Sequence, residues 1–222
     1  AYRSLPFSLD DFTYIGGFYD TPTWILAHKD RGYADFRAFL EAAKAKPGNI
    51  TLGSATPAGA QALMAAAIKG VTGLNFRIIP YQGGDPMRKA LLSNEVDAGI
   101  IHSPVMLPEV KEGLIRVLAT GLPLQHIVYE PVRHVPTLKS LGIPIEIGII
   151  RGLFVPKATP KEIVTKITQA AEQSARSEAF RNFGEKFGFL PVWIPGPQFE
   201  QIMRNELALF KDIKAKYIDP AK

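Results

Sequence analysis

Apolar residues recur at helical spacing in several stretches of the chain. Phe36, Phe39, Leu40 and Ala43 lie at positions i, i+3, i+4 and i+7, which places them on one face of a helix. Pro47-Gly48 is expected to end that helix. The alanine-rich stretch 60–69 predicts a second helix that stops at Gly70. A last helix is expected over about residues 198–216.

Short apolar runs between these helices predict strands at 50–52, 74–80, 96–101, 114–119 and 145–155. Asp85 is expected to cap the helix that follows the glycines at 83 and 84. Thr159 is expected to cap a later helix, with Pro160 at its first position. Strands that alternate with helices in this way predict an α/β fold with a parallel or mixed sheet.

Composition narrows the functional class. The chain has 222 residues, of which 46% are hydrophobic and 21% charged, as in ordinary globular proteins. No apolar run reaches the roughly 18 residues that a membrane-spanning helix needs. The net charge is +5, but the basic residues are scattered, so we expect no nucleic-acid partner. A secretion signal is not recognisable at the start of this sequence.

The side chains for common catalytic and metal sites do not occur in the required patterns. Cysteine is absent, which excludes a disulfide scaffold, a thiolate zinc site and a cysteine nucleophile. The four histidines do not form an H-E-x-x-H pair, and the sequence has neither G-x-S-x-G nor a P-loop. We therefore expect no metal, no cofactor and no catalytic residues.

Two loops that join a predicted strand to a predicted helix are candidate ligand sites. The first holds Ser54, Thr56, Gly59 and Ala60, whose hydroxyls and free N–H groups suit an anion at a helix N-terminus. The alternative is an ordinary turn with a Ser/Thr cap. The second loop comprises Tyr81, Gln82 and Gly83, where an aromatic face and close backbone approach are available. The alternative is a Gly-rich turn with a surface tyrosine.

His102 is a third candidate, because it follows the predicted strand at 96–101. Open α/β sheets bind ligands at the carboxyl ends of their strands, so all three segments are expected at one edge. A lone histidine at a strand end is also commonly a surface or hydrogen-bonded structural residue.

At these positions the chain resembles the extracytoplasmic solute-binding proteins of tripartite tricarboxylate transporters, known as the Bug family. Six segments carry the resemblance in register from about residue 10 to 216. They are DFTYIG at 11–16, AAKAKPG at 42–48, IPYQG at 79–83, ALLSNEVD at 90–97, VPTL at 135–138 with Gly142, and RGLFVPKATP at 151–160.

The resemblance implies a two-lobed periplasmic binding protein fold of type 2, with mixed sheets flanked by helices. Residues 24–135 would form the second lobe, and residues 1–23 and 136–222 would belong to a first lobe that is incomplete in this chain. The loop at 53–60 departs from the family pattern, because Thr56 and Ala58 stand where glycines are usual. Close approach of a ligand to this backbone is therefore less favoured.

The resemblance also implies the function. A monomeric periplasmic receptor would close on a small carboxylate and deliver it to membrane transporter subunits, without catalysis. The resemblance also implies that Tyr19 and Asp20 lie near the ligand, because the corresponding part of the family fold borders the cleft. Two alternatives stay open at this point. They are a ligand-sensing regulatory domain of the same topology and, with less support, an enzyme on this fold.

Overall fold

The computed structural model describes residues 6–122 and 129–219. Within these residues the strands are β1 (Phe12–His28), β2 (Thr51–Ser54), β3 (Arg77–Pro80), β4 (Ala98–His102), β5 (Ile115–Thr120), β6 (Gly148–Pro156) and β7 (Leu190–Pro195). The α-helices are α1 (Phe36–Ala45), α2 (Ala60–Thr72), α3 (Gly84–Leu92), α4 (Ser103–Lys111), α5 (Lys161–Ala175), α6 (Glu178–Phe187) and α7 (Gly196–Tyr217).

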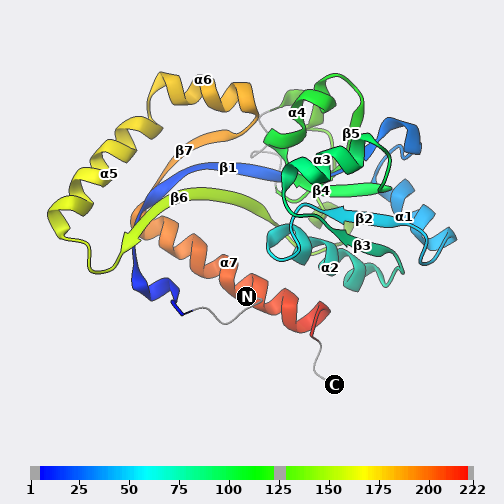
Figure 1. Cartoon of the computed structure of the whole chain (residues 1–222), viewed down its shortest axis with the longest axis horizontal. Coiled ribbons are helices and arrows are strands. Elements are labelled where there is room, and N and C mark those ends of the chain that lie inside the picture. The colour runs from blue at the N-terminus through cyan, green and yellow to red at the C-terminus, as the bar shows by residue number, and fades with distance from the viewer. Residues whose placement is uncertain (1–5, 123–128, 220–222) are drawn as a thin grey trace.

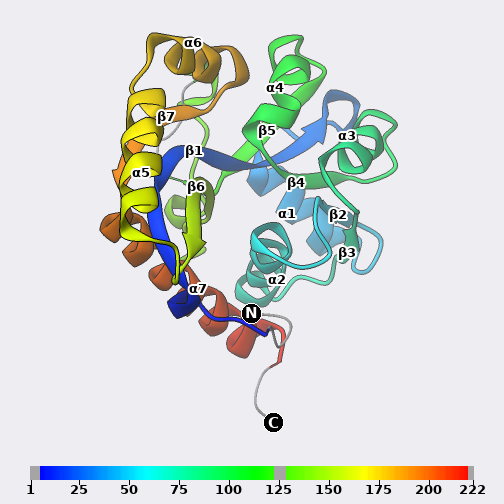
Figure 2. The ribbon, with the colours of Figure 1, turned by 60° about the vertical axis from the view of Figure 1, so that its left-hand side comes forward.

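Strand β1 belongs to two sheets. Its first part, Phe12 to Pro22, pairs antiparallel with β6, and Gly16 to Asp20 also pairs with β7. From Thr23 onward β1 pairs antiparallel with β4 and β5. We call β6-β1-β7 the smaller sheet and β3-β2-β4-β1-β5 the larger sheet. Figure 2 shows β1 running from one to the other.

The larger sheet carries helices on both faces. Strands β2, β3 and β4 are parallel to one another, whereas β1 is antiparallel to β4 and β5, so the predicted mixed sheet is confirmed. One face is covered by a core to which α1, α2, the end of α7 and the segment 138–147 contribute. A second core lies between the opposite face and α3 and α4. Both faces are apolar because crossover helices bury them.

The smaller sheet is covered on one side by α7 and on the other by α5 and α6 (Figure 1). Phe199 of α7 is buried and contacts Tyr14 of β1 edge-on. On the other side, Phe180 of α6 lies against Phe18 and Tyr19 of β1. The same strand thus anchors helices from the C-terminal third of the chain.

The division into lobes at 24–135 stays a prediction. The strand pairing of β1 changes between Pro22 and Thr23, close to the first expected boundary. After the second expected boundary, Leu138, Ile143, Ile145 and Ile147 are still buried in the core of the larger sheet.

Three expected helix ends are wrong. Helix α2 continues through Gly70 to Thr72. Tyr217 of α7 packs where a Gly70 side chain would stand, which accounts for the glycine. The glycine therefore serves a contact between helices rather than a helix end. Helix α3 is capped by Gly83, with Asp85 inside its first turn, and α5 is capped by Pro160 rather than Thr159.

Candidate functional site

The two loops singled out from the sequence lie side by side. Strands β2 and β3 pair in parallel, with Ser54 opposite Pro80. Beyond the strand ends, the Tyr81 N–H donates to the Ser54 carbonyl at 2.8 Å, and the Gly83 N–H donates to the Ala55 carbonyl at 3.0 Å. The backbone itself thus joins the loops at the carboxyl edge of the larger sheet.

Three helices begin at this edge without a capping side chain. Helices α2, α3 and α4 follow β2, β3 and β4, and their N-cap residues are Gly59, Gly83 and His102. None of the three N-caps makes a side-chain hydrogen bond to its first turn. By contrast, Asp35 caps α1 by accepting from the Ala38 N–H at 2.9 Å. The first-turn N–H groups and the helix dipoles therefore concentrate positive potential at this edge.

Glycine is required at two of these caps. Gly59 has a φ of 125° and Gly83 has a φ of 122°, a region that residues with a side chain rarely adopt. Ala60 is the first residue of α2. The sequence departs from the family glycines at Thr56 and Ala58. It has glycine at the cap position, Gly59, where a serine is usual in the family and where this conformation needs glycine.

The hydroxyls of the first loop hold the loop itself. The fully buried Ser54 hydroxyl donates to the Thr56 carbonyl at 2.8 Å. The Thr56 hydroxyl donates to the Gln61 side-chain oxygen at 3.2 Å. These bonds fix the backbone that presents the α2 N-terminus, so Ser54 and Thr56 act here on loop shape.

Tyr81 packs against the larger sheet rather than standing free. Its ring contributes to the core beneath α3, close to Gly53. Its hydroxyl donates to a Glu95 carboxylate oxygen at 2.7 Å. Burial, together with the Glu95 hydrogen bond and charge, raises the pKa of Tyr81 to about 12. Gln82, the next residue, is exposed.

His102 lies where the two sheets meet. It is opposite Thr23 in the β1–β4 register and directly precedes α4. Its Nδ1 is buried and has no hydrogen-bond partner among the described residues. Burial, and secondarily the positive charge of Arg151, lower the pKa of His102 to about 4. The imidazole is therefore neutral at neutral pH.

The two candidates on β1 have different surroundings. Tyr19 has its ring 4.3 Å from that of Phe189, and the Arg151 guanidinium lies 5.3 Å from the Tyr19 ring centre. Asp20 follows Tyr19, so its side chain leaves the opposite face of the strand. Its charge and, more strongly, burial raise the pKa of Glu206 on α7 to about 7. Tyr19 is thus grouped with His102 through Arg151, whereas Asp20 interacts with α7.

Sequence reasoning did not single out Arg151, Thr21 and Thr23 as site residues. Arg151 is a charged residue in the otherwise uncharged strand β6, with two isoleucines before it and Gly152-Leu153 after it. That interruption of an apolar run was the available signal. The two threonines are fully buried in β1, and nothing in their local sequence distinguishes them from strand residues.

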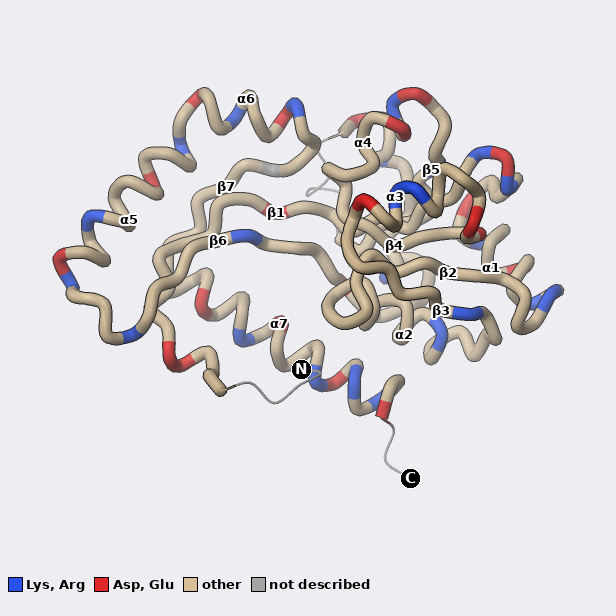
Figure 3. Tube along the Cα trace, viewed as in Figure 1, with Lys and Arg blue, Asp and Glu red and all other residues tan. Residues whose placement is uncertain are grey.

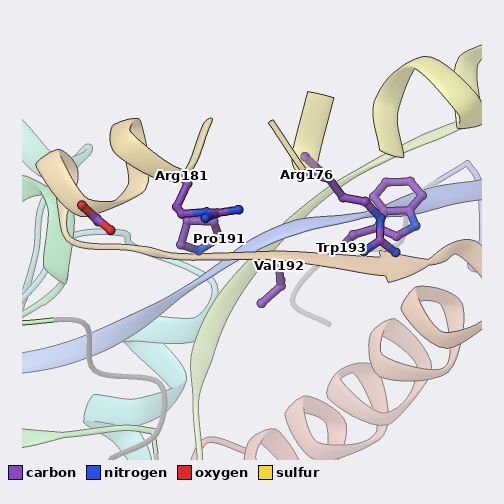
Figure 4. Close-up of a pocket in the computed structure, with 7 residues that line it drawn as sticks. Arg176, Arg181, Pro191, Val192 and Trp193 are labelled. Carbon is purple, nitrogen blue, oxygen red and sulfur yellow. The ribbon is translucent and has the colours of Figure 1, made fainter. Parts of the chain in front are cut away.

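A separate pocket of about 480 Å³ lies on the smaller-sheet side, between α5, α6 and β7 (Figure 4). Its walls include Arg176, Arg181, Pro191, Val192 and Trp193. Arg176 pairs with Glu172 at 2.9 Å. None of the predicted ligand residues lines this pocket.

Residues 6–122 and 129–219 contain neither a cluster of metal-ligating side chains nor a membrane-spanning helix. In that part of the chain, no group of three or more histidine, aspartate or glutamate side chains is arranged to hold a metal ion. No helix there combines the length and apolar character needed to cross a membrane.

Comparison with known proteins identifies relatives over most of the chain. A curated relative from Cupriavidus necator, "UPF0065 protein in gbd 5'region", is 28% identical over 93% of this chain. The chain spans 62% of the length of that relative.

Solved structures agree with this fold. A TctC solute-binding protein from Polaromonas matches 96% of this chain and 72% of its own length, at 27% identity and a TM-score of 0.76. A structure described as "R. palustris Rpa4515 with adipate" matches 98% of this chain and 72% of its own length, at 23% identity and a TM-score of 0.84. The second likeness shows the fold alone.

The profile of the family named "Tripartite tricarboxylate transporter family receptor" matches residues 1–217. This match, the relative and the likeness to solved structures agree, and the resemblance carried by the sequence segments is confirmed. The chain belongs to the TctC family of tripartite tricarboxylate transporter receptors.

Proposed function

We propose that this chain is the ligand-binding part of a periplasmic receptor that captures a small organic carboxylate. The ligand would bind at the carboxyl edge of the larger sheet, facing β1 and β6, and the receptor would deliver it to the membrane subunits of a transporter. Binding would involve no covalent step, and a ligand that contacts both sheets would favour a closed arrangement.

One observation carries this proposal. The N-termini of α2, α3 and α4 meet at one edge, and none of them is capped by a side chain. Unsatisfied N–H groups at helix N-termini bind anions, because the donors and the helix dipole favour negative charge. The net charge of +5 adds a general attraction for anions.

The comparisons support the ligand class and the transport role. The family is named for tripartite tricarboxylate transporters, and a structural neighbour at 23% identity is described with bound adipate. The Polaromonas relative is described as a solute-binding protein. These descriptions concern other proteins, and they support carboxylate capture rather than catalysis for this chain.

A thermal-shift screen tests the ligand class. The 222-residue chain would be melted with succinate, glutarate, adipate, malate and citrate, with glucose and adenosine as uncharged controls. A ligand present at 100 times its dissociation constant adds about 2.7 kcal/mol to the free energy of unfolding. We expect at least one carboxylate to raise the melting temperature and the uncharged controls to leave it unchanged.

The opposite pattern would contradict the assignment of a carboxylate ligand. A rise with glucose or adenosine and none with any acid would show that the edge does not select anions.

The transport role needs its own test. A pull-down of the cognate membrane subunits should be stronger with the ligand-loaded chain than with the empty chain.

A further inference from the structure

Arg151 lies near the point where β1 passes from the smaller sheet to the larger sheet. It lies in β6 of the smaller sheet and is opposite Tyr19 of β1. It is the one charged residue of β6, as the single blue segment on that strand shows in Figure 3. A half-buried arginine in an apolar strand is costly unless its charge has a partner.

The protein gives this guanidinium no anionic partner among the described residues. Its Nη1 donates to the Thr21 hydroxyl at 3.1 Å, and the group lies over the Tyr19 ring. Both partners are neutral. Several other arginines of the chain are paired with carboxylates, among them Arg31 with Asp97 at 2.8 Å and Arg176 with Glu172 at 2.9 Å. Because a guanidinium has five N–H donors, most of the Arg151 donors remain available.

Two further polar groups near Arg151 are also unsatisfied. Thr23 is fully buried and its hydroxyl has no hydrogen-bond partner among the described residues. The same holds for His102 Nδ1, and His102 is opposite Thr23 in the β1–β4 register. Thr21 and Thr23 are two residues apart on β1, so their side chains share one face. We call Arg151, Thr21, Thr23 and His102 the junction cluster.

The junction cluster has the character of an anion site. Arg151 is charged. Burial and, secondarily, the charge of Arg151 lower the pKa of His102 to about 4, so the imidazole stays neutral at neutral pH. Asp20 lies between Tyr19 and Thr21 in β1, so its side chain leaves the opposite face of the strand from theirs. Its charge acts on Glu206 of α7. The cluster thus offers hydrogen-bond donors and one positive charge that no carboxylate of the described residues compensates.

We propose that Arg151 pairs with a second carboxylate of the ligand, so that the receptor selects dicarboxylates over monocarboxylates. This inference rests on the proposed function. The helix N-termini of the larger sheet would hold one carboxylate, and Arg151 of the smaller sheet would hold the other. A dianion would then contact both sheets at once, and its binding energy would favour their approach.

The experiment compares each acid with its partner of equal carbon number. Isothermal calorimetry at pH 7.5 would measure succinate against butyrate, glutarate against pentanoate and adipate against hexanoate. The proteins would be the wild-type 222-residue chain, Arg151→Gln, Arg151→Lys and the control Arg77→Gln. Arg77 is also a strand arginine, but it is exposed, and its side chain makes no ion pair or hydrogen bond with the described residues. Melting temperatures of all four proteins would be recorded alongside.

We expect Arg151→Gln to weaken the best dicarboxylate by about ten- to a hundredfold, the usual effect of losing a charged hydrogen bond. The matching monocarboxylate should change by less than about threefold. Arg151→Lys should lie between, because lysine keeps the charge and loses the bidentate fork. Arg77→Gln should bind both acids as the wild type does.

Each contrary result has its own meaning. Equal losses for the two acids, including losses caused by misfolding, would show a structural role for Arg151 and overturn the inference. Unchanged dicarboxylate affinity in Arg151→Gln would also overturn it while leaving the proposed function intact. If the wild type binds none of the six acids but binds an uncharged compound, the proposed function fails and this inference fails with it.

Discussion

The Asp97 carboxylate connects three segments of the larger sheet. One oxygen accepts from the Thr51 N–H and from the Thr51 hydroxyl, each at 2.8 Å. The other oxygen accepts from the Arg31 guanidinium at 2.8 Å, and Arg31 lies shortly after the end of β1. Asp97 belongs to one of the segments that resemble the family. Its contacts join β1, β2 and β4, and this structural role accounts for an aspartate at this position. The contacts do not involve the candidate ligand residues.

Asp97→Asn should therefore destabilise the protein without changing ligand binding. The amide would retain one acceptor, place a donor against other donors and lose the ion pair. We expect the free energy of unfolding in urea to fall by about 2 kcal/mol. The exposed Asp85→Asn should change it by less than about 0.5 kcal/mol. Equal urea midpoints for Asp97→Asn and the wild type would contradict this account.

Glu206 makes stability depend on pH. Its pKa is raised from 4.5 to about 7, first by burial and then by the charge of Asp20. The folded protein therefore holds this proton more tightly than the unfolded chain does. The resulting contribution to stability is fully present below about pH 4.5 and is lost as pH rises through about 7.

Glu206→Gln should remove this dependence. Between pH 5 and 8 the wild type should lose about 2–3 kcal/mol that the variant retains. Urea unfolding at several pH values would measure the difference, with the exposed Glu185→Gln as the control. Parallel pH profiles for the wild type and Glu206→Gln would show that the raised pKa is not a property of this residue.

Helix α7 approaches β1 closely because its first residue has no side chain. A Cβ on Gly196 would overlap the Tyr14 carbonyl oxygen, which is backbone and has little freedom to move. Phe199, one turn later, is buried against Tyr14. The docking of α7 on the smaller sheet thus depends on the backbone contact at Gly196.

Gly196→Ala should weaken that docking. We expect the free energy of unfolding to fall by about 1–3 kcal/mol, because the helix must move away from the strand. Gly17→Ala is the matched control at the same sheet, since its nearest atom, Ile194 Cβ, would lie at 3.3 Å. Chemical denaturation of the two variants measures the difference. A smaller loss for Gly196→Ala than for Gly17→Ala would show that α7 tolerates the displacement.

Elements with a local signal were predictable from the sequence, and those that serve distant contacts were not. Helix α1 follows from its apolar spacing, and the meeting of the two loops follows from strand ends sharing one edge. Gly70 was misread because its neighbour Tyr217 lies far along the chain. Arg151 and His102 come together only because β1 links their strands, and no local pattern shows that.

On the scale of the whole molecule, the smaller sheet leaves apolar side chains exposed. Leu153 of β6 is 45% exposed and Phe154 is 50% exposed. Among the described residues β6 pairs only with β1, so its other edge has no strand beside it. An open edge with exposed apolar groups favours association between molecules.

Leu153→Lys should reduce concentration-dependent self-association of the 222-residue chain. The substitution would replace an apolar side chain by a charged one, and the charges of two molecules would repel each other at the open edge. Sedimentation velocity over a range of concentrations would measure this, with Thr165→Lys on exposed α5 as a control of equal charge change. Equal suppression by both variants would attribute the effect to net charge rather than to this edge.

The sharing of β1 also determines how the molecule unfolds. A strand that lies inside both sheets cannot leave one without removing an interior strand of the other. The two sheets are therefore one cooperative unit in thermodynamic terms, and local opening of either is limited by the same strand. Heat should melt the protein in a single transition, and a ligand bound at one edge should slow amide exchange throughout both sheets.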